Sequence, residues 1–546
     1  MSGSITLENR FGVNKMELIS LKYAIFVIVL LVLYYCFPKK YRWYVLLAGS
    51  MAYYVIICKW YVLFIIFTIC TTYGSTIWID KLLKKQNAIV KSHKEDWDRQ
   101  TRKDYKEKGR KKRVAVMLFA LLCNFGILAF LKYIPYAGEL GLLLPLGISF
   151  YTFQSMGYVM DVYREIVEPE KNFLKVALFV SFFPQIIQGP IAIYDKLAGQ
   201  LYEGHSLRLE NLQNGALLVL WGVMKKLVIA DRAVNIINFV MDKPMDFSGT
   251  YVFFAAVVYA LQLYADFSGG IDIVRGIAEM FGITMSTNFN HPYFSRSLTE
   301  YWHRWHMTLG DWCRNYIFYP LSISKRFLNF GKWLKPRFGA HISKVLPGCI
   351  ASVITFIVIG VWHGANMKYL YFGLWNGIVI MLAELFAPVS KKVAGGFFKL
   401  TGLREKGIFA TIVSVIWTFM LILVGYYFDI AANASTAFHM LFKSVTDFHI
   451  SELGINNIIL NLGACGLDEY DILLLIICTL LWFFISFVEE NKKLDMRDFI
   501  LSRKLPLRWA IIYLGIFIVI IFGYYGPGVN PADFVYMPVS YTHLRA

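Results

Sequence analysis

Charged residues are scarce in this chain, which has 546 residues, of which 17% are charged and 57% hydrophobic. Such a composition, with a mean hydropathy of +0.51, excludes an ordinary soluble domain. Internal repeats and Gly/Ser-rich or Pro-rich linkers are also absent, so we expect a single membrane domain over residues 16–537. We expect residues 1–15 to be a non-native or disordered extension and residues 538–546 to be a non-native tail.

Paired cysteines are missing as well. The eight cysteines stand singly, mostly within apolar runs, and none forms a C-x-x-C pair. Isolated cysteines of this kind behave as small buried hydrophobic residues, which argues against a disulfide framework or a structural zinc site. The chain also lacks a G-x-S-x-G elbow, an H-E-x-x-H pair and a Walker A loop. These absences argue against a serine hydrolase, a zinc protease and an ATP-driven pump, and we expect no bound metal or cofactor.

Long uncharged runs are what the chain has in abundance. Runs of about 18 residues or more are long enough for a helix to cross the hydrocarbon core. Those that qualify are 60–79, 114–131, 140–160, 176–194, 247–265, 345–367, 407–428 and 509–525, with shorter or singly charged runs at 19–38, 43–57, 211–224, 369–383 and 472–488. We therefore predict an all-α polytopic membrane protein with about eleven to thirteen transmembrane or re-entrant helices.

The net charge of +18 would suggest a nucleic-acid partner in a soluble protein, but its location gives it another meaning. Residues 81–113 hold fourteen Lys/Arg against five acids, and Lys325–Lys344 holds six basic residues and no acid. An excess of Lys and Arg in loops marks the cytoplasmic side. We therefore predict that both loops, and Lys391–Lys406, are cytoplasmic, that the N-terminus lies outside, and that no nucleic acid binds.

The first candidate for a chemical site lies within residues 285–344, where aromatic and ionisable residues are mixed. Such a mixture suggests broken or re-entrant helices that line a cavity. On a continuous helix His306 and Trp302 would share a face, as would Arg314 and Gly310. An interfacial aromatic belt anchored by Arg and His remains the alternative. His303 and His306 could bind a metal, but no Cys, Asp or Glu stands at ligand spacing.

The second candidate is His363, which lies deep in an uncharged apolar segment between Trp362 and Gly364. An imidazole there is costly unless it faces a wet cavity or a partner, so it is a functional candidate. Small residues at Gly360, Gly364 and Ala365 would let a substrate or a neighbouring backbone come close. The alternative is a neutral histidine that is hydrogen-bonded between helices.

Histidine suits acyl transfer because its pKa lies near neutrality. A neutral ring can take a proton from an attacking hydroxyl and return it to a leaving thiolate. A third group, Asp266 and Asp272, follows an apolar span. These acids could orient a histidine, or they could cap the helix after Gly270.

At these residues the sequence resembles the membrane-bound O-acyltransferase (MBOAT) family, in particular its bacterial branch of alginate O-acetyltransferases and teichoic acid D-alanyltransferases. The similarity extends over nearly the whole chain. It is carried by five ordered blocks: LPLGISFYTFQSMGYVMDVYR (144–164), FVSFFPQIIQGPI (179–191), LYADFSGGIDI (263–273), NFNHPYFSRSLTEYWHRWHMTLGDWCRNYIFYPL (288–321) and GVWHGANMKYLYFGLWNG (360–377). His303 and Asn315 depart from the usual residues of the fourth block, which blurs the choice of acceptor.

The resemblance implies a catalytic histidine at His363 and a second one at His306, on a helical bundle with a central funnel or tunnel. It implies a cytoplasmic thioester donor, acetyl-CoA or another acyl thioester, whose phosphates the basic residues 325–344 would suit. The acceptor would be an extracytoplasmic cell-surface polysaccharide, and an extracytoplasmic accessory acetyltransferase protein is in keeping with this branch. The further residues assigned to the pocket or the donor are Trp302, Trp305, Trp362, Asn366, Arg304, Arg314, Asp266 and Asp272.

Three other functions remain open on the sequence alone. D-alanyl transfer to teichoic acid would use a cytoplasmic carrier protein as donor, and peptidoglycan could replace alginate or another polysaccharide as acceptor. A transporter or a flippase of acyl or glycan intermediates belongs to a different class. It would show paired inverted repeats with acids near mid-span, which the chain lacks.

Overall fold

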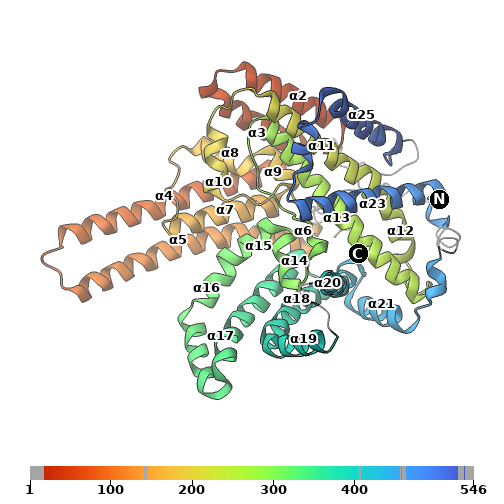
Figure 1. Ribbon diagram of the computed structural model, residues 1–546. Coiled ribbons are helices and arrows are strands. Elements are labelled where there is room, and N and C mark those ends of the chain that lie inside the picture. Colours follow the sequence, from red (N-terminus) through yellow and green to blue (C-terminus); the bar gives the residue numbers. More distant parts are fainter. Residues whose placement is uncertain are drawn as a thin grey trace. The chain divides into compact units, whose positions relative to one another are not determined.

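The computed structural model describes residues 18–140, 142, 144–401, 404, 407–454, 457, 463–526 and 534, and all regular structure among them is helical (Figure 1). This confirms the all-α prediction. The described chain divides into two compact units, 18–219 with 270–286, and 220–269 with 287–526 and 534. That residues 16–537 act as one domain stays a prediction, and the proposed extensions 1–15 and 538–546 lie outside the described residues.

The first unit is built from helices near the start of the chain. They are α2 (Leu21–Cys36), η1 (Lys39–Tyr41), α3 (Arg42–Cys58), η2 (Lys59–Tyr61), α4 (Val62–Ser92), α5 (Arg99–Tyr133), α6 (Pro135–Glu139), α7 (Ile148–Tyr163), α8 (Phe173–Ser181), α9 (Phe183–Gln188) and α10 (Tyr194–Tyr202). Two further helices, α11 (Leu209–Met224) and α13 (Gly249–Met280), contribute residues to both units.

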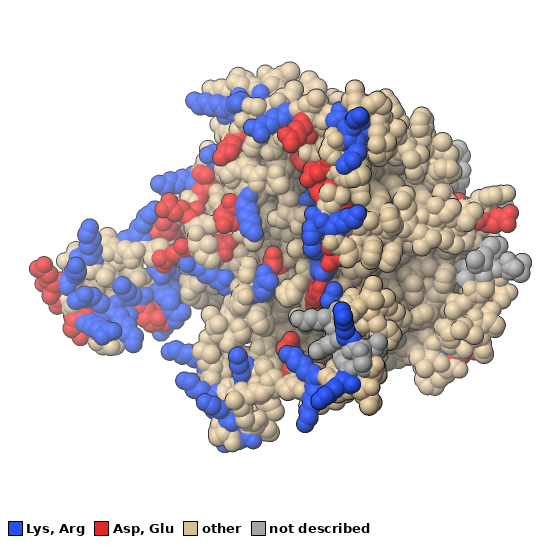
Figure 2. Space-filling model, viewed as in Figure 1, with Lys and Arg blue, Asp and Glu red and all other residues tan. Residues whose placement is uncertain are grey.

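Helices α4 and α5 form a long antiparallel hairpin whose outer end carries the basic residues 81–113 (Figures 1 and 2). We expected a loop here, and that expectation is wrong, because only residues 93–98 interrupt the helices. Lys, Arg, Glu and Gln are good helix formers, and pairs such as Lys84–Asp80, at 2.6 Å, add support one turn apart. Asp98 caps α5 by accepting a hydrogen bond from a backbone N–H in its first turn.

The second unit contains the helices that carry both candidate histidines. They are η3 (Lys225–Ala230), α12 (Asp231–Met241), η4 (Pro292–Phe294), α14 (Leu298–Arg304), α15 (Met307–Cys313), η5 (Arg314–Phe318), α16 (Tyr319–Ser322), α17 (Lys325–His363), α18 (Met367–Leu385), α19 (Ala387–Thr401), α20 (Ile408–Ile430), α21 (Ala434–Thr446), η6 (Ile450–Leu453), η7 (Gly463–Cys465), α23 (Glu469–Lys492), α24 (Met496–Leu501) and α25 (Leu505–Phe522). Buried apolar side chains of α12, α13, α20, α21 and α23 pack into one core.

The basic stretch Lys325–Lys344 is helical as well, although we expected a loop. It includes the first part of α17, which follows the N-cap Ser324 and ends at a break at Gly339, and the start of the second part. The positive φ of 82° at Gly339 reverses the chain, so that the two parts of α17 form a hairpin (Figure 1). The second part of α17 then runs through the apolar segment to His363.

Seven helices among the described residues are long and apolar enough to cross a membrane, or eight if the bent pair α18 and α19 is one span. This is consistent with a multi-pass membrane protein. It is fewer than the eleven to thirteen transmembrane or re-entrant segments predicted. Several expected segments are short helices; α7 and α8, for example, have 16 and 9 residues and mostly buried side chains. Apolar runs of this kind fill the interior of the protein rather than face lipid.

Candidate active site

The segment that carries His306 is a broken helix. Helix α14 follows the N-cap Ser297, whose side chain accepts a hydrogen bond from the backbone of Glu300, and ends at Arg304. Trp305 is extended and His306 adopts a left-handed conformation (φ 43°, ψ 53°) before α15 begins. The expected continuous helix is therefore wrong, whereas the expected break within residues 285–344 is present. A left-handed histidine is strained and persists only where other contacts hold it.

Asn288 provides those contacts. Its backbone oxygen accepts a hydrogen bond from Met307 N–H at 2.9 Å. Its side-chain Oδ1 lies 3.1 Å from the backbone nitrogen of Thr308, 2.9 Å from Thr308 Oγ1 and 3.2 Å from His306 Nδ1. One residue thus holds both the backbone around His306 and its imidazole ring.

The ring of His306 lies in an apolar environment. The residue is 2% exposed, and the ring of Phe267 meets it edge-on at 4.9 Å. Burial disfavours the charged form and, with a smaller contribution from His363, lowers the pKa of His306 to about 3. His306 is therefore a neutral imidazole near neutral pH.

His363 is the last residue of α17 and is half-buried. Its ring stacks on Tyr369 at 5.9 Å and meets Phe372 edge-on at 5.3 Å, both of them on α18. Helices α17 and α18 pack this closely because of glycine: a Cβ at Gly360 would lie 2.3 Å from the backbone oxygen of Tyr369. The predicted close approach of a neighbouring backbone at Gly360 is confirmed.

Trp362 brings the two histidines together. Its ring centroid lies 4.9 Å from that of His363 and 6.4 Å from that of His306. Trp302 belongs to the same aromatic group, since its ring lies 6.2 Å from that of Phe372 and its Nε1 donates to Asn376 Oδ1 at 3.0 Å. A half-buried imidazole and a buried neutral one thus share a wall of aromatic side chains.

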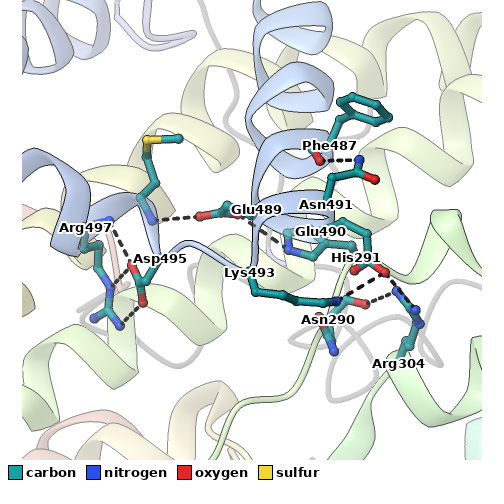
Figure 3. A network of polar contacts seen from close by, with 11 residues as sticks. Asn290, His291, Arg304, Phe487, Glu489, Glu490, Asn491, Lys493, Asp495 and Arg497 are labelled. Carbon is teal, nitrogen blue, oxygen red and sulfur yellow. Dashed lines mark hydrogen bonds and ion pairs between the residues drawn. The ribbon is translucent and has the colours of Figure 1, made fainter.

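Arg304 and Trp305 contact residues outside this aromatic group. The guanidinium of Arg304 pairs with Glu300 at 2.7 Å and with Glu490 of α23 at 3.0 Å, within a network that also includes His291 (Figure 3). Trp305 is buried against neighbouring aromatic rings, with that of Phe289 at 5.0 Å. These contacts favour a structural role for Arg304 over the predicted assignment to the pocket or the donor.

Three other predicted residues lie at exposed or partly exposed positions. Asn366 is the N-cap of α18, where its side chain accepts a hydrogen bond from the backbone of Lys368. Arg314 pairs with Asp311 at 2.6 Å and keeps 40% of its side chain exposed. His303 is exposed on α14, whereas His306 is buried, so these two histidines do not form a pair.

Asp266 and Asp272 do not follow the end of a helix as expected, because α13 continues past both to Met280. Asp266 is 0% exposed and lies 2.7 Å from Lys226 Nζ, which also lies 2.7 Å from Asp231. Asp272 belongs to the first unit and pairs with Arg275 at 3.4 Å. Among the residues that the structure describes, no three His, Cys, Asp or Glu side chains are grouped to bind a metal.

Sequence reasoning missed Asn288, Phe267 and Lys226. The signal for Lys226 was available, because a lysine pair interrupts an apolar run and ionisable residues within such runs are functional candidates by default. Phe267, whose ring contacts that of His306, is the next residue along α13 from Asp266, which pairs with Lys226. Asn288 had no comparable signal.

Comparisons with known proteins find similarity to acyltransferases. The model of MBOAT, the membrane-bound O-acyltransferase family, matches residues 169–335. The chain is 30% identical to "Probable alginate O-acetylase AlgI" of Pseudomonas syringae pv. tomato, over 57% of this chain and 54% of that protein. It is 30% identical to "Peptidoglycan O-acetyltransferase" of Helicobacter pylori (50% and 56%) and 26% identical to "Teichoic acid D-alanyltransferase" of Bacillus subtilis (52% and 67%).

The chain thus spans somewhat more than half the length of these acetyltransferase relatives. The family match includes His306 and Asn288 and ends before His363. The predicted resemblance is confirmed: this multi-pass bacterial membrane protein contains a segment, residues 169–335, that matches the model of the membrane-bound O-acyltransferase family.

Proposed function

We propose that the protein is a membrane O-acyltransferase that moves an acetyl group from a cytoplasmic thioester, acetyl-CoA or another acyl thioester, to hydroxyls of an extracytoplasmic cell-surface polysaccharide. The observation that carries the proposal is the pair of imidazoles, His306 and His363, whose ring centroids lie 6.4 Å and 4.9 Å from that of Trp362. The names of the alginate and peptidoglycan relatives support acetyl as the transferred group.

In this mechanism His363 is the general base. A sugar hydroxyl attacks the carbonyl carbon of the thioester, a C–O bond forms and the C–S bond breaks. The hydroxyl proton passes to His363 and from there to the departing thiolate, so that charge is balanced at each step. The half-buried position of His363 supports this role, because a base must be within reach of both reactants.

The remaining residues shape the site and bind the donor. Trp302, Trp305 and Trp362 form aromatic walls, and the buried ion pair of Asp266 with Lys226 fixes the part of α13 that carries Phe267, whose ring contacts His306. Arg314 and the basic first part of α17 are accessible and would bind the phosphates of the donor. An extracytoplasmic accessory acetyltransferase protein would complete modification of the polymer.

The test compares ester-linked acetate on purified surface polymers from cells that carry the wild type, His363→Ala or His303→Ala. His303→Ala is the matched control, because this exposed histidine on α14 lies outside the proposed site. We expect acetate to be lost only with His363→Ala. Equal acetate with equal amounts of the two proteins would contradict the role of His363.

D-alanyl transfer to teichoic acid is the second candidate. It is favoured by the Bacillus subtilis relative, of which a larger share, 67%, is matched than of the acetyltransferase relatives. The same polymer analysis separates the two functions, because alkaline hydrolysis releases acetate in one case and D-alanine in the other.

A further inference from the structure

The orientation of the Asn288 side chain follows from the backbone nitrogen of Thr308. A backbone N–H can only donate, so the Asn288 atom 3.1 Å from it must be the amide oxygen and not the nitrogen. The Thr308 hydroxyl, 2.9 Å from the same oxygen, donates to it as well. Because the backbone N–H of Thr308 can only donate, it establishes that the Asn288 atom facing His306 is the amide oxygen.

This assignment fixes the tautomer of His306. Its Nδ1 lies 3.2 Å from the Asn288 oxygen, which has no proton to give, so Nδ1 must carry the hydrogen. In a neutral imidazole the other nitrogen then has a lone pair and only accepts hydrogen bonds. Nε2 of His306 is therefore an acceptor on the ring edge opposite Asn288.

Asn288 is not placed for stability alone. It is 1% exposed, and its amide nitrogen has no hydrogen-bond partner in the described part of the chain. A buried unsatisfied donor costs about 1–3 kcal/mol, and such a group in a native structure calls for an explanation. The amide oxygen at the other end of the side chain explains this cost. It holds His306 in a left-handed conformation and determines which ring nitrogen carries the proton.

We infer that Asn288 is a positioning residue that holds His306 in the tautomer whose Nε2 accepts a hydrogen bond from the attacking hydroxyl. The inference rests on the proposed function and makes it more specific. His306 orients the nucleophile and does not donate to the thioester carbonyl. The neutral amide is suited to this role, because a carboxylate at the same place would favour the charged imidazolium.

The activity test uses membranes that contain their own polymer and radiolabelled acetyl-CoA as the probe. We expect Asn288→Leu, similar in volume but without an acceptor, to lower kcat about 10–100-fold with little change in KM, as for other groups that orient a histidine. Asn290→Ala is the matched control, because that side chain is exposed two residues further on. Full activity of Asn288→Leu, in membranes where His306→Ala is inactive, would overturn the inference.

The variant Asn288→Asp separates positioning from folding. It restores an oxygen acceptor and adds a negative charge beside Nδ1, so we expect activity to return with the acid limb of the pH profile moved to higher pH. A purely structural Asn288 would leave the profile where the wild type has it, and that result would contradict the inference.

The tautomer itself can be read from nitrogen NMR shifts of protein labelled at histidine, with His306→Ala identifying the signals of His306. We expect a protonated Nδ1 and an unprotonated Nε2, and the reverse would overturn the inference whatever the activity. If the wild type transfers neither acetyl nor D-alanyl groups but shows the expected tautomer, the proposed function fails and the positioning by Asn288 stands.

Discussion

Replacing Gly360 with alanine would push a methyl group into the backbone of α18. The new Cβ would lie 2.3 Å from the Tyr369 oxygen, whereas ordinary contact begins at 3.4 Å, so the helices must separate by about 1 Å. Because His363 lies three residues further along α17 and stacks on Tyr369, the shift moves the proposed base. A displacement of about 1 Å in an active site costs about 10²-fold in rate, and overpacking costs about 1–3 kcal/mol of stability.

Gly348→Ala is the matched control in the same helix. A Cβ there has no neighbour within 4 Å, and alanine is the better helix former by about 0.5–1 kcal/mol. Transfer of radiolabelled acetate in membranes and thermal unfolding in detergent would be measured for both variants. We expect a slow, less stable Gly360→Ala and an active Gly348→Ala. Wild-type transfer by Gly360→Ala would refute the reasoning that the close packing of α17 and α18 positions His363.

Three further predictions concern the buried polar groups of the second unit. His306→Ala should lower transfer by about 10²–10⁴-fold with normal amounts of folded protein, and full turnover would show that His306 is structural. Lys226→Met leaves Asp231 and Asp266 buried without their shared cation, so we expect a loss of about 3–5 kcal/mol in thermal or denaturant unfolding; an unchanged midpoint would contradict the ion pair. Between pH 6.5 and about 3 the unfolded chain binds a proton at His306 that the folded protein does not bind, so stability falls as the pH falls through this window. His306→Gln should make that fall shallower in melts recorded across these pH values, and an identical slope would argue against a buried neutral ring.

The membrane class and the helical fold could be predicted from the sequence, because uncharged runs and polar breaks are local signals. His363 could be singled out for the same reason, since an imidazole within an apolar segment is unusual wherever it folds, and His306 was indicated by the mixture of aromatic and ionisable residues around it. The extension of α4, α5 and α17 through the charged residues 81–113 and 325–344 was not predicted. There the density of charged residues was interpreted as loop, although those residue types are good helix formers.

The details of the site could not be predicted, because they depend on contacts between distant residues. The break at His306 depends on Asn288, which is 18 residues earlier. The position of Asp266 within α13 depends on Lys226, which is 40 residues away. Helical periodicity relates residues one turn apart, so it favoured an unbroken helix through His306, and it could not exclude the expected helix end after Gly270.

The central claim is that His306 and His363 act as one site, and a double-mutant cycle tests it most directly. Transfer of radiolabelled acetyl groups would be measured for His306→Ala, His363→Ala and the double variant, with equal amounts of folded protein. Residues that act as a unit give strongly non-additive losses. We predict that the double variant is no more than a few-fold slower than His363→Ala alone. Losses that multiply in the double variant would contradict the account.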